Sequence, residues 1–413
     1  MLFQDERFGL FIHWGLYSLN GWHEQEMWRK NVDKAHYIRQ MEKFNPTCFD
    51  PEAWMLAAKK AGMQYICFTT KHHDGFCMWD TAFSDYKVTN TPYGRDILKE
   101  VADACHRNGL LLALYYSVPD WNNPFSLNYG ASHQLPAPNP GDTPDEKKYI
   151  QYVKNQVQEL LTGYGKIDAF FWDIPPQTYD ASINALVYQL QPGILINDRG
   201  YSEGDYKTPE RCIPEGPFQG LTEACQSVGE QSWGYRSNED YFSHPYLMAG
   251  IDTIMRKGGN YLLNIGPMPD GRFPEAATET LMRIGSWYQR VKESYLYCTV
   301  IPAANKPYAL TCRGNDLYVH LPLPPVSSGI VLPVTSALPI SATVLNTGQT
   351  LHAVMEEMPS TFEPGKPIQK SLHVSGIPVN VVADEVIVLK LTFEHLDALI
   401  PELSDTEAVS SVL

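Results

Sequence analysis

Short apolar runs alternate with amphipathic stretches from the N-terminus to about residue 297. Six of these runs predict buried strands, because each is short and bounded by polar residues. They cover residues 8–12, 65–69, 110–116, 167–172, 194–197 and 261–265. Apolar residues at helical spacing fill segments between them, at residues 96–108, 145–161, 181–190 and 274–291. This repeated alternation of strand and helix predicts a parallel sheet.

Polar or aromatic residues stand at the ends of several predicted strands. The pattern favours a closed (β/α)8-like barrel over residues 1–297, whose site is assembled from many strand ends. An open doubly wound sheet would gather its ligand at one switch point, and no glycine-rich phosphate motif follows the first strand. The strand-end residues are His13-Trp14, His72-His73-Asp74, Tyr115-Tyr116, Asp173 and Asn197-Asp198-Arg199.

The pattern of residue types changes after residue 298. Short β-rich runs separated by Pro, Gly, Ser and Asn lie at residues 317–322, 329–333, 342–346, 371–374 and 386–392. This pattern predicts a compact antiparallel β-sandwich over residues 298–395. Residues 396–413 are polar and acidic, and we expect a frayed tail there.

Composition narrows the range of partners. The chain has 413 residues and a net charge of −15, without any basic run, which argues against nucleic acid and anionic membranes. The N-terminus lacks a basic segment with a cleavage site, and no apolar run approaches 18 residues. We therefore expect a cytoplasmic protein, unless the chain is a trimmed form of a secreted one.

The histidines and cysteines do not have metal-site spacing. His72 and His73 are adjacent, so on a strand their side chains point to opposite faces. His13 has no second histidine nearby, and the eight cysteines show no CxxC pair. We expect no metal and no other cofactor, and one of the two adjacent histidines can be a structural hydrogen-bonding residue.

Asp173 is the acidic residue that stands out. It ends the apolar run 169–172, and a carboxyl group at the end of a buried strand is costly unless it is hydrogen-bonded or functional. Capping of the following loop is the alternative. An acid-rich region follows Arg199, and one of its acids could face Asp173. Two carboxylates in a polar pocket with aromatic walls suit glycoside hydrolysis.

A set of motifs in order resembles the α-L-fucosidases of glycoside hydrolase family 29. The motifs cover nearly all of residues 7–297 and the C-terminal β-region fits the family's appended sandwich. They are FGLFIHWGLYS, FNPTCFDPEAW, TKHHDGFCMWD, TPYGRDILKEV, LYYSVPDW, FFWD, INDRG, GDYKTPE, SWGY, NEDY and GGNYLLNIGPMPDG. The resemblance implies a (β/α)8-like barrel and exo-acting release of L-fucose, with retention of configuration and without metal.

The resemblance also implies a set of substrate-binding residues. The paired histidines of KHHDGF, His72 and His73, would donate and accept hydrogen bonds with fucose hydroxyls. Other positions that match sugar-contacting residues of the family are His13, Tyr115, Arg199, Trp172, Glu26 and Trp28. Glu26 and Trp28 depart from the family pattern, in which the glutamate and tryptophan are adjacent.

The catalytic residues follow from the same motifs. The family nucleophile matches Asp173, although the preceding Trp172 is one place closer than in the family. For the acid/base we expect Glu210 of the TPE sequence, with Glu223 as the runner-up and Glu215 third. Asp173 would form a covalent fucosyl-enzyme, with the glutamate first donating a proton and then activating water. Retention requires a carboxyl separation of about 5–5.5 Å.

Three alternatives remain at this point. The chain could be a binding protein on an inactive scaffold, a metal-dependent hydrolase of amide or phosphate bonds, or a glycosidase for another sugar such as galactose. The expected partner is a fucosylated oligosaccharide or glycoconjugate. The preferred linkage and the oligomeric state stay open, with a homo-oligomer among the options.

Overall fold

The computed structural model describes residues 6–127, 132–210, 218–302, 306–359, 364–365, 367–368 and 370–404. The chain divides into two compact units. Unit 1 comprises Met1–Cys212, Gly220–Phe242 and Asn260–Met282, and unit 2 comprises Ile213–Gln219, Ser243–Gly259 and Arg283–Leu413. This division does not coincide with the boundary expected at residue 297, because residues 243–259 and 283–297 cluster with the C-terminal sheets.

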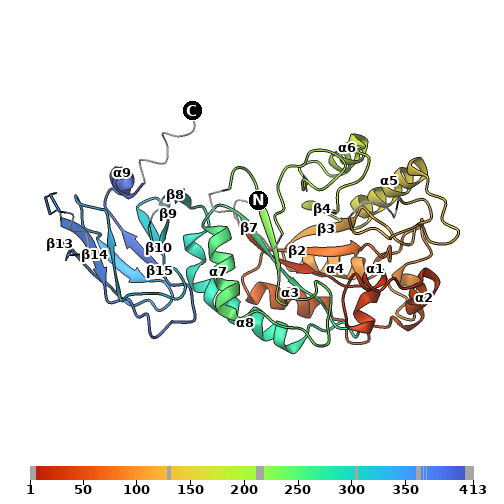
Figure 1. Ribbon diagram of the computed structural model, residues 1–413, viewed down its shortest axis with the longest axis horizontal. Helices are drawn as coiled ribbons and strands as arrows, with labels where there is room; N and C mark the ends of the chain where they lie inside the picture. Colours follow the sequence, from red (N-terminus) through yellow and green to blue (C-terminus); the bar gives the residue numbers. More distant parts are fainter. Residues whose placement is uncertain are drawn as a thin grey trace. The chain divides into compact units, whose positions relative to one another are not determined.

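Unit 1 is built on a curled sheet of seven parallel strands (Figure 1). The order across the sheet is β5-β4-β3-β2-β1-β7-β6. The strands are β1 (Phe8–Ile12), β2 (Tyr65–Lys71), β3 (Leu111–Ser117), β4 (Ala169–Asp173), β5 (Leu195–Ile196), β6 (Glu223–Ser227) and β7 (Asn260–Ile265). The six strands expected from the apolar runs are confirmed, and β6 is an addition.

Within the described residues, the sheet does not close into the eight-stranded barrel that the sequence predicted. Residues 206–210, which lie between the edge strands β5 and β6, make only single bridges: Asn197 with Tyr206, Lys207 with Thr222, and Glu210 with Cys225. The segment is polar and contains Pro209, which lacks the N–H that a regular strand needs. It is nevertheless anchored to both edges of the sheet.

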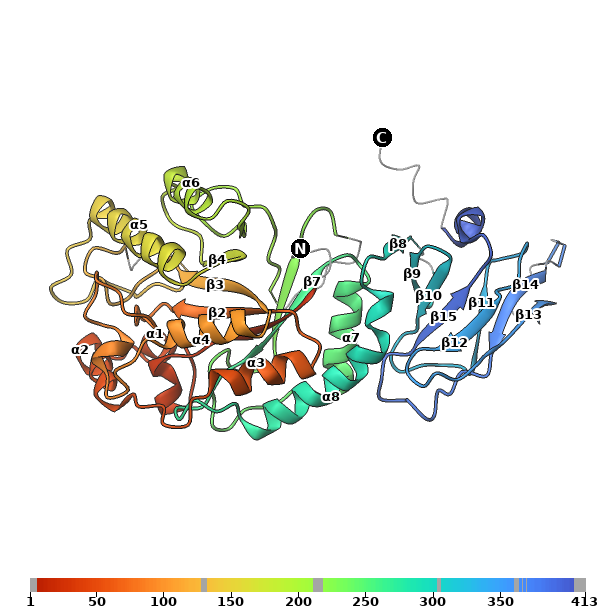
Figure 2. The ribbon, with the colours of Figure 1, turned by 180° about the vertical axis from the view of Figure 1, so that it is seen from behind.

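Four helices of unit 1, like the short α2 (Lys34–Ile38) with Asp33, begin after an aspartate that caps the first turn. They are α3 (Pro51–Lys60), α4 (Ile97–Arg107), α5 (Glu146–Gly163) and α6 (Ala181–Leu190), with Asp50, Asp96, Asp145 and Asp180 as caps. Each carboxylate accepts a backbone N–H that the helix itself leaves unpaired. The helices pack pairwise, α3 with α4 and α5 with α6 (Figure 2). Shorter segments are η1 (Leu16–Asn20), α1 (Glu26–Arg29), α2 (Lys34–Ile38), η2 (Arg39–Lys43) and η3 (Val88–Asn90).

Alternate side chains of the strands form a buried layer on the inner face of the curled sheet. This inner layer contains Phe11, Tyr65, Cys67, Ala113, Tyr115, Ala169, Phe171, Tyr206, Cys225 and Leu262. The period-two alternation of a strand sends the residues between them to the opposite face. The inner layer therefore supports the side chains at the carboxyl ends of the strands.

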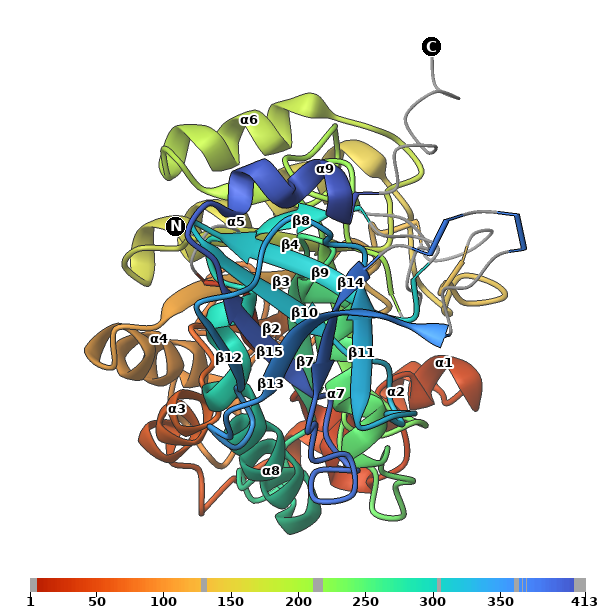
Figure 3. The ribbon, with the colours of Figure 1, turned by 90° about the vertical axis from the view of Figure 1, so that its left-hand side faces the viewer.

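Unit 2 contains two antiparallel sheets, as expected, around one shared core (Figure 3). One sheet has the order β12-β15-β10-β9-β8, and the other has β11-β14-β13. The strands are β8 (Thr299–Ile301), β9 (Ala309–Arg313), β10 (Asp316–His320), β11 (Gly329–Leu332), β12 (Ser341–Val344), β13 (His352–Glu357), β14 (Lys370–Ser375) and β15 (Val388–Thr392).

Several helical segments of unit 2 lie within the described residues. They are α7 (His244–Met255), η4 (Lys292–Ser294), η6 (Leu396–Leu399), α9 (Ile400–Leu403) and the later part of α8 (Glu275–Val291), which begins in unit 1. Residues 396–403, expected in the tail, bury Leu396, Leu399 and Leu403 in the shared core. Among the described residues, no helix is both long and apolar enough to cross a lipid bilayer.

Candidate active site

A cavity of about 90 Å³ lies in unit 1 among side chains from the carboxyl ends of the parallel strands. Parallel strands present these ends at one edge of the sheet, so residues distant in sequence converge there. The polar lining residues are His13, Gln25, His72, His73, His133, Asp173, Arg199 and Glu210, and the others are Phe11, Tyr115, Phe171, Ile174, Cys225 and Trp233. Six of the eight polar ones are residues that the sequence singled out.

Asp173, the last residue of β4, is held by three hydrogen bonds. The Tyr115 hydroxyl donates to Oδ2 at 2.7 Å, and Arg199 Nη1 donates to Oδ1 at 3.0 Å. The backbone N–H of Ile174 also donates to Oδ1, at 3.0 Å. Ile174 has φ +60°, which is costly for a β-branched residue and typical of functional sites. The carboxylate is thus fixed in the cavity by its neighbours on three segments.

The surroundings keep Asp173 ionised. Burial by itself raises the pKa of this carboxyl group, but the nearby His73 and Arg199 and the hydrogen bonds from Tyr115 and Arg199 outweigh it. The net result is that the pKa of Asp173 lies below its ordinary value. A carboxylate that is ionised and partly stripped of water is suited to nucleophilic attack.

Arg199 connects Asp173 with Glu210. Its Nη1 atom lies 3.1 Å from Glu210 Oε2 and 3.0 Å from Asp173 Oδ1, and its Nη2 atom donates to the backbone oxygen of Thr208 at 2.6 Å. Because both carboxylate oxygens are within 3.1 Å of one nitrogen, they are no farther apart than about twice that distance. Glu210 is the more exposed of the two, with 41% of its side chain accessible against 14% for Asp173.

His73 is held in one tautomer by hydrogen bonds on the side away from Asp173. Its Nδ1 atom lies 2.7 Å from Ser117 Oγ, and that hydroxyl donates its own hydrogen to the backbone oxygen of Pro119 at 2.6 Å. The hydroxyl oxygen must therefore accept from Nδ1–H, which leaves Nε2 as an acceptor. Nε2 lies 3.8 Å from Asp173 Oδ2. Burial lowers the pKa of His73 to about 4, so the ring is neutral near pH 7.

His13 is oriented in the same way by a residue of β7. Its Nδ1 atom lies 2.6 Å from Asn264 Oδ1, which can only accept. The amide of Asn264 is itself oriented, because its Nδ2 atom donates to the Trp233 backbone oxygen at 2.7 Å. In the neutral ring of His13, the hydrogen is therefore on Nδ1 and Nε2 is the acceptor nitrogen.

His72 stacks on Tyr115, with ring centroids 5.7 Å apart and planes 8° from parallel. Its Nδ1 atom is buried and has no hydrogen-bond partner among the described residues. Burial, and then the neighbouring His73, hold the pKa of His72 well below its ordinary value. A buried nitrogen without a partner is costly unless a ligand supplies one.

The structure does not bring Glu223 into this site. As the first residue of β6 it lies at the amino end of its strand, opposite the strand ends that form the cavity. Its Oε2 atom accepts a hydrogen bond from the Tyr65 hydroxyl at 2.6 Å, next to Cys67 and Cys225. Burial raises the pKa of Glu223 to about 7, although the bond from Tyr65 lowers it in part. Glu215 lies outside the described residues.

Trp172, Glu26 and Trp28 are also placed away from the cavity. Trp172 follows the strand alternation and points to the opposite face, where its Nε1 atom donates to Asn184 of α6 at 3.0 Å. Glu26 accepts from Asn20 at 2.6 Å and from Lys30 at 2.9 Å. Trp28 packs against His133, with ring centroids 5.3 Å apart. His133 is itself one of the residues of the cavity wall.

Seven residues that line the cavity were not singled out from the sequence: Phe11, Gln25, His133, Phe171, Ile174, Cys225 and Trp233. Trp233, in the SWGY motif, stacks on His13 with ring centroids 5.4 Å apart, and the motif itself could have signalled it. Gln25 is the neighbour of the expected Glu26. His133 lies in the loop between β3 and α5 with φ +58°, and no pattern in the sequence marks it.

The described residues contain no group of three or more His, Cys, Asp or Glu side chains arranged to hold a metal ion. Donors and acceptors in the cavity are instead spread around its wall, as suits a ligand rich in hydroxyl groups.

Comparisons with known proteins place this chain beside members of one enzyme family. A family model described as alpha-L-fucosidase matches residues 1–293. Tissue alpha-L-fucosidase of Homo sapiens is 27% identical over 353 residues, which cover 77% of this chain and 72% of that protein. The same enzyme of Rattus norvegicus is 26% identical over 351 residues, with the same shares of both chains.

Two solved structures extend the similarity to the fold. Alpha-L-fucosidase isoenzyme 1 from Paenibacillus thiaminolyticus has a TM-score of 0.85 and 32% identity, covering 94% of this chain and 97% of that one. An alpha-L-fucosidase of glycoside hydrolase family 29 from Bacteroides thetaiotaomicron has a TM-score of 0.79 and 26% identity, with 94% of each chain covered. The latter is a covalent intermediate trapped with 2-fluoro-fucosyl fluoride in a glutamate-to-glutamine mutant.

Proposed function

Because this chain belongs to the alpha-L-fucosidase family, we propose that it releases L-fucose from the ends of fucosylated glycans with retention of configuration. The family assigns it to the glycoside hydrolases and gives it alpha-L-fucosidase activity. The proposal adds the course of the reaction: a double displacement in which Asp173 is the nucleophile and Glu210 is the acid/base.

The observation that carries this proposal is the pair of carboxylates on one guanidinium nitrogen. Asp173 and Glu210 both bond to Arg199 Nη1, so their separation is compatible with the about 5–5.5 Å of retaining enzymes. An inverting pair, at about 6.5–9.5 Å, would leave room for a water molecule between the carboxyl group and the sugar.

In the first step, Asp173 attacks the anomeric carbon while the bond to the leaving oxygen breaks. Tyr115 and Arg199 hold the attacking carboxylate in one orientation, which reduces the entropy lost on reaching the transition state. The trapped intermediate of the Bacteroides thetaiotaomicron relative supports a covalent fucosyl-enzyme in this family. In the second step, water attacks the same carbon and releases Asp173.

Glu210 serves as the acid in the first step and the base in the second. Its side chain is the more exposed of the two carboxylates, on the side from which an aglycone can reach the cavity. A sugar that enters between Glu210 and Arg199 separates them and brings its leaving oxygen within reach of the Glu210 carboxyl group. Glu223 is buried at the other end of its strand and has no access to the leaving oxygen.

The histidines bind the hydroxyl groups of the sugar by hydrogen bonds. His13 and His73 each offer an Nε2 acceptor fixed by the bond at Nδ1, and His72 offers an Nδ1 atom without a partner. A sugar that lacks one of the matching hydroxyls would leave a buried group of the protein unpaired. The cost of that unpaired group makes the site discriminate strongly against such a sugar. Phe171, Tyr115 and Trp233 supply apolar walls that accept the C5 methyl group of fucose.

The test is the stereochemistry of hydrolysis. An aryl α-L-fucoside is hydrolysed in an NMR tube and the anomer that forms first is recorded. We expect α-L-fucose first, followed by slow mutarotation. The β anomer first would overturn the double displacement. Hydrolysis of an aryl galactoside at a higher kcat/KM than the fucoside would overturn the substrate, and loss of activity with a chelator would point to a metal-dependent reaction.

A further inference from the structure

Lys71, the last residue of β2, is a fully buried cation directly before His72 and His73. None of its side chain is accessible to solvent. Lysine is almost never buried to this extent unless it is paired. Lys71 does not line the cavity, and nothing in the proposed reaction uses it.

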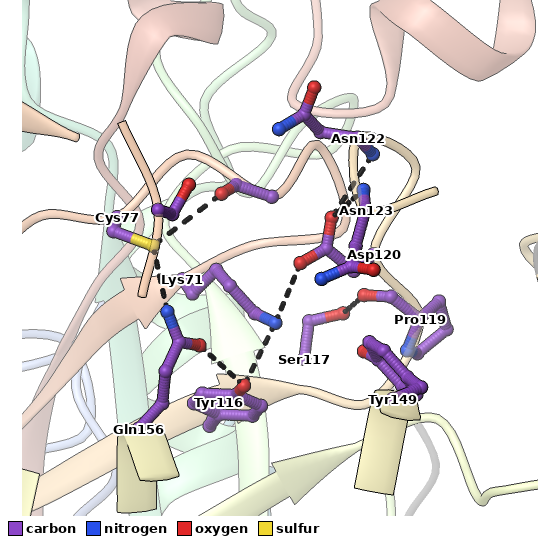
Figure 4. Close-up of polar contacts among 12 residues, drawn as sticks. Lys71, Cys77, Tyr116, Ser117, Pro119, Asp120, Asn122, Asn123, Tyr149 and Gln156 are labelled. Carbon is purple, nitrogen blue, oxygen red and sulfur yellow. Dashed lines mark hydrogen bonds and ion pairs between the residues drawn. The ribbon is translucent and has the colours of Figure 1, made fainter. Parts of the chain in front are cut away.

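The ammonium group of Lys71 is held by β3 and the loop after it (Figure 4). Its Nζ atom lies 2.9 Å from Asp120 Oδ2 and 3.0 Å from the Tyr116 hydroxyl oxygen. Tyr116 accepts this bond and donates its own hydrogen to Gln156 of α5, at 2.7 Å. Burial alone lowers the pKa of Lys71, but the facing Asp120 outweighs it and the pKa is raised, so the group stays charged.

The second oxygen of Asp120 fixes the course of the following loop. Oδ1 accepts the backbone N–H groups of Asn122 and Asn123, at 3.0 and 2.8 Å. The turn after His73 makes room for this carboxylate: Gly75 has φ +79°, and a Cβ atom there would collide with Asp120 Oδ1. The ends of β2 and β3 are therefore fitted to each other around the Lys71–Asp120 pair.

His73 is bonded to this same loop at two points. The backbone N–H of Trp121 donates to the His73 carbonyl oxygen at 2.8 Å. Pro119 accepts from Ser117 Oγ, which in turn accepts from His73 Nδ1. A shift of residues 119–121 would thus move His73. It would also weaken the hydrogen bonds that keep the ring hydrogen of His73 on Nδ1.

We propose that Lys71 and Asp120 form a positioning pair, which fixes residues 117–121 so that His73 keeps Nδ1–H and presents Nε2 as an acceptor beside Asp173. Neither residue touches the sugar, and the inference rests on the proposed function only for what His73 then binds. A buried ion pair stabilises a fold little more than a well-packed apolar pair of similar volume, so stability does not explain its presence. The pairing of β2 with β3 has a register irregularity between Thr69 and Lys71, next to this contact, and such irregularities re-aim side chains.

The test replaces the pair by groups of similar shape without charge, in Lys71→Met/Asp120→Asn. The exposed pair Lys99 and Asp103 on α4, changed in the same way to Met and Asn, is the matched control. The readout is the ¹⁵N NMR spectrum of the His73 ring in the ligand-free protein, assigned by its loss in His73→Gln. We expect the double variant to move His73 from Nδ1–H toward Nε2–H, with kcat for an aryl fucoside reduced about 10²-fold. The control variant should leave the His73 tautomer and kcat unchanged.

Ser117→Ala removes the bond to His73 without touching the ion pair, and should produce the same change of tautomer. It keeps the test decisive if the double variant does not fold. An unchanged Nδ1–H signal in either variant would overturn the proposal, even if melting temperature or activity fell. Because the tautomer is measured without substrate, a shift of the tautomer in the variants, together with a wild-type protein that hydrolyses no fucoside, would retain the positioning pair and refute the proposed function instead.

Discussion

Asp173 and Glu210 share one hydrogen-bond donor, the Nη1 atom of Arg199. The three groups come from three segments: the end of β4, the residues after β5, and the stretch 206–210 that is bridged to β6. This arrangement separates the two carboxylates by role. Asp173 is enclosed and accepts hydrogen bonds on both oxygens, and Glu210 is exposed enough to contact a leaving group.

Asp173→Ala should reduce turnover of an aryl fucoside by at least about 10³-fold, because the nucleophile is lost while the binding wall remains. Azide should restore activity and give a fucosyl azide of inverted configuration, since the small anion attacks from the space left by the carboxylate. Circular dichroism serves as the check on folding. Activity within about tenfold of the wild type would remove Asp173 from the mechanism.

Glu210→Ala and Glu223→Ala should differ in their dependence on the leaving group. Without the acid, natural oligosaccharides should be hydrolysed very slowly, whereas aryl fucosides with acidic phenols need little protonation and should keep their first step. We expect this pattern for Glu210→Ala, with azide giving a product of retained configuration. Glu223→Ala should affect both substrates alike, through folding. The opposite pattern would make Glu223 the acid/base.

Glu223 should instead make stability depend on pH. Its pKa is about 7 in the native state and 4.5 ordinarily, so between these pH values the native state binds more protons than the unfolded one. Its contribution is complete below pH 4.5 and is lost as pH rises through 7, by roughly 3 kcal/mol in total. Glu223→Gln should therefore gain stability relative to the wild type as pH rises over this range.

Thermal melts of both proteins at pH 5 and pH 8 measure that difference. Glu42→Gln, at an exposed glutamate, is the control and should show no such trend. A difference between Glu223→Gln and the wild type that is the same at both pH values would show that Glu223 is not protonated in the native state.

Much of the fold could be predicted because hydrophobic periodicity dominates in both units. The runs at residues 8–12 and 65–69 are mainly apolar and buried throughout, and the helices from residue 97 and residue 146 follow aspartate caps. Strand β6, with the sequence EACQS, was missed because its polar residues are buried by neighbours that are remote in sequence. Closure of the barrel was expected from strand-end polarity, which says nothing about hydrogen bonding across residues 206–210.

The site was predictable where a residue stands at a strand end. Asp173, His72 and His73 are of this kind, and the topology alone brings them together. Trp172 shows the limit, since a single step along a strand reverses the direction of the side chain and the motif does not fix that step. His133 and Gln25 lie in loops whose course depends on tertiary contacts, so no local pattern could place them.

His72 should bind the sugar and not a metal ion. Its unpartnered Nδ1 atom is buried in the cavity, and His72→Ala should weaken inhibition by L-fucose by roughly 1–3 kcal/mol. The measurement is the fucose inhibition constant, together with metal analysis of the purified protein. A stoichiometric zinc ion whose removal abolishes activity would contradict this assignment.

Glu24 should support the cavity wall, whereas Glu26 should be dispensable for catalysis. Glu24 Oε2 accepts bonds from the Ser232 hydroxyl and from the backbone N–H groups of Trp233 and Gly234, at 2.7, 3.0 and 3.2 Å. Glu24 therefore fixes the loop that carries the Trp233 ring against His13. Glu26, two residues later, bonds to Asn20 and Lys30, which do not line the cavity.

Replacing each by alanine compares the two at nearly the same place in the chain. Glu24→Ala should raise KM for an aryl fucoside about tenfold or more, because a mobile Trp233 no longer closes the cavity over the sugar. Glu26→Ala should leave KM and kcat within about twofold.

Burial raises the pKa of Glu24, but His23 and the bond from Ser232 lower it more, so the pKa is below its ordinary value of 4.5. Its stabilising contribution is therefore present above pH 4.5 and is lost as pH falls below it, a loss that Glu24→Ala should not show. If Glu26→Ala instead gave the larger rise in KM, Glu26 would be the sugar contact that the family pattern first suggested.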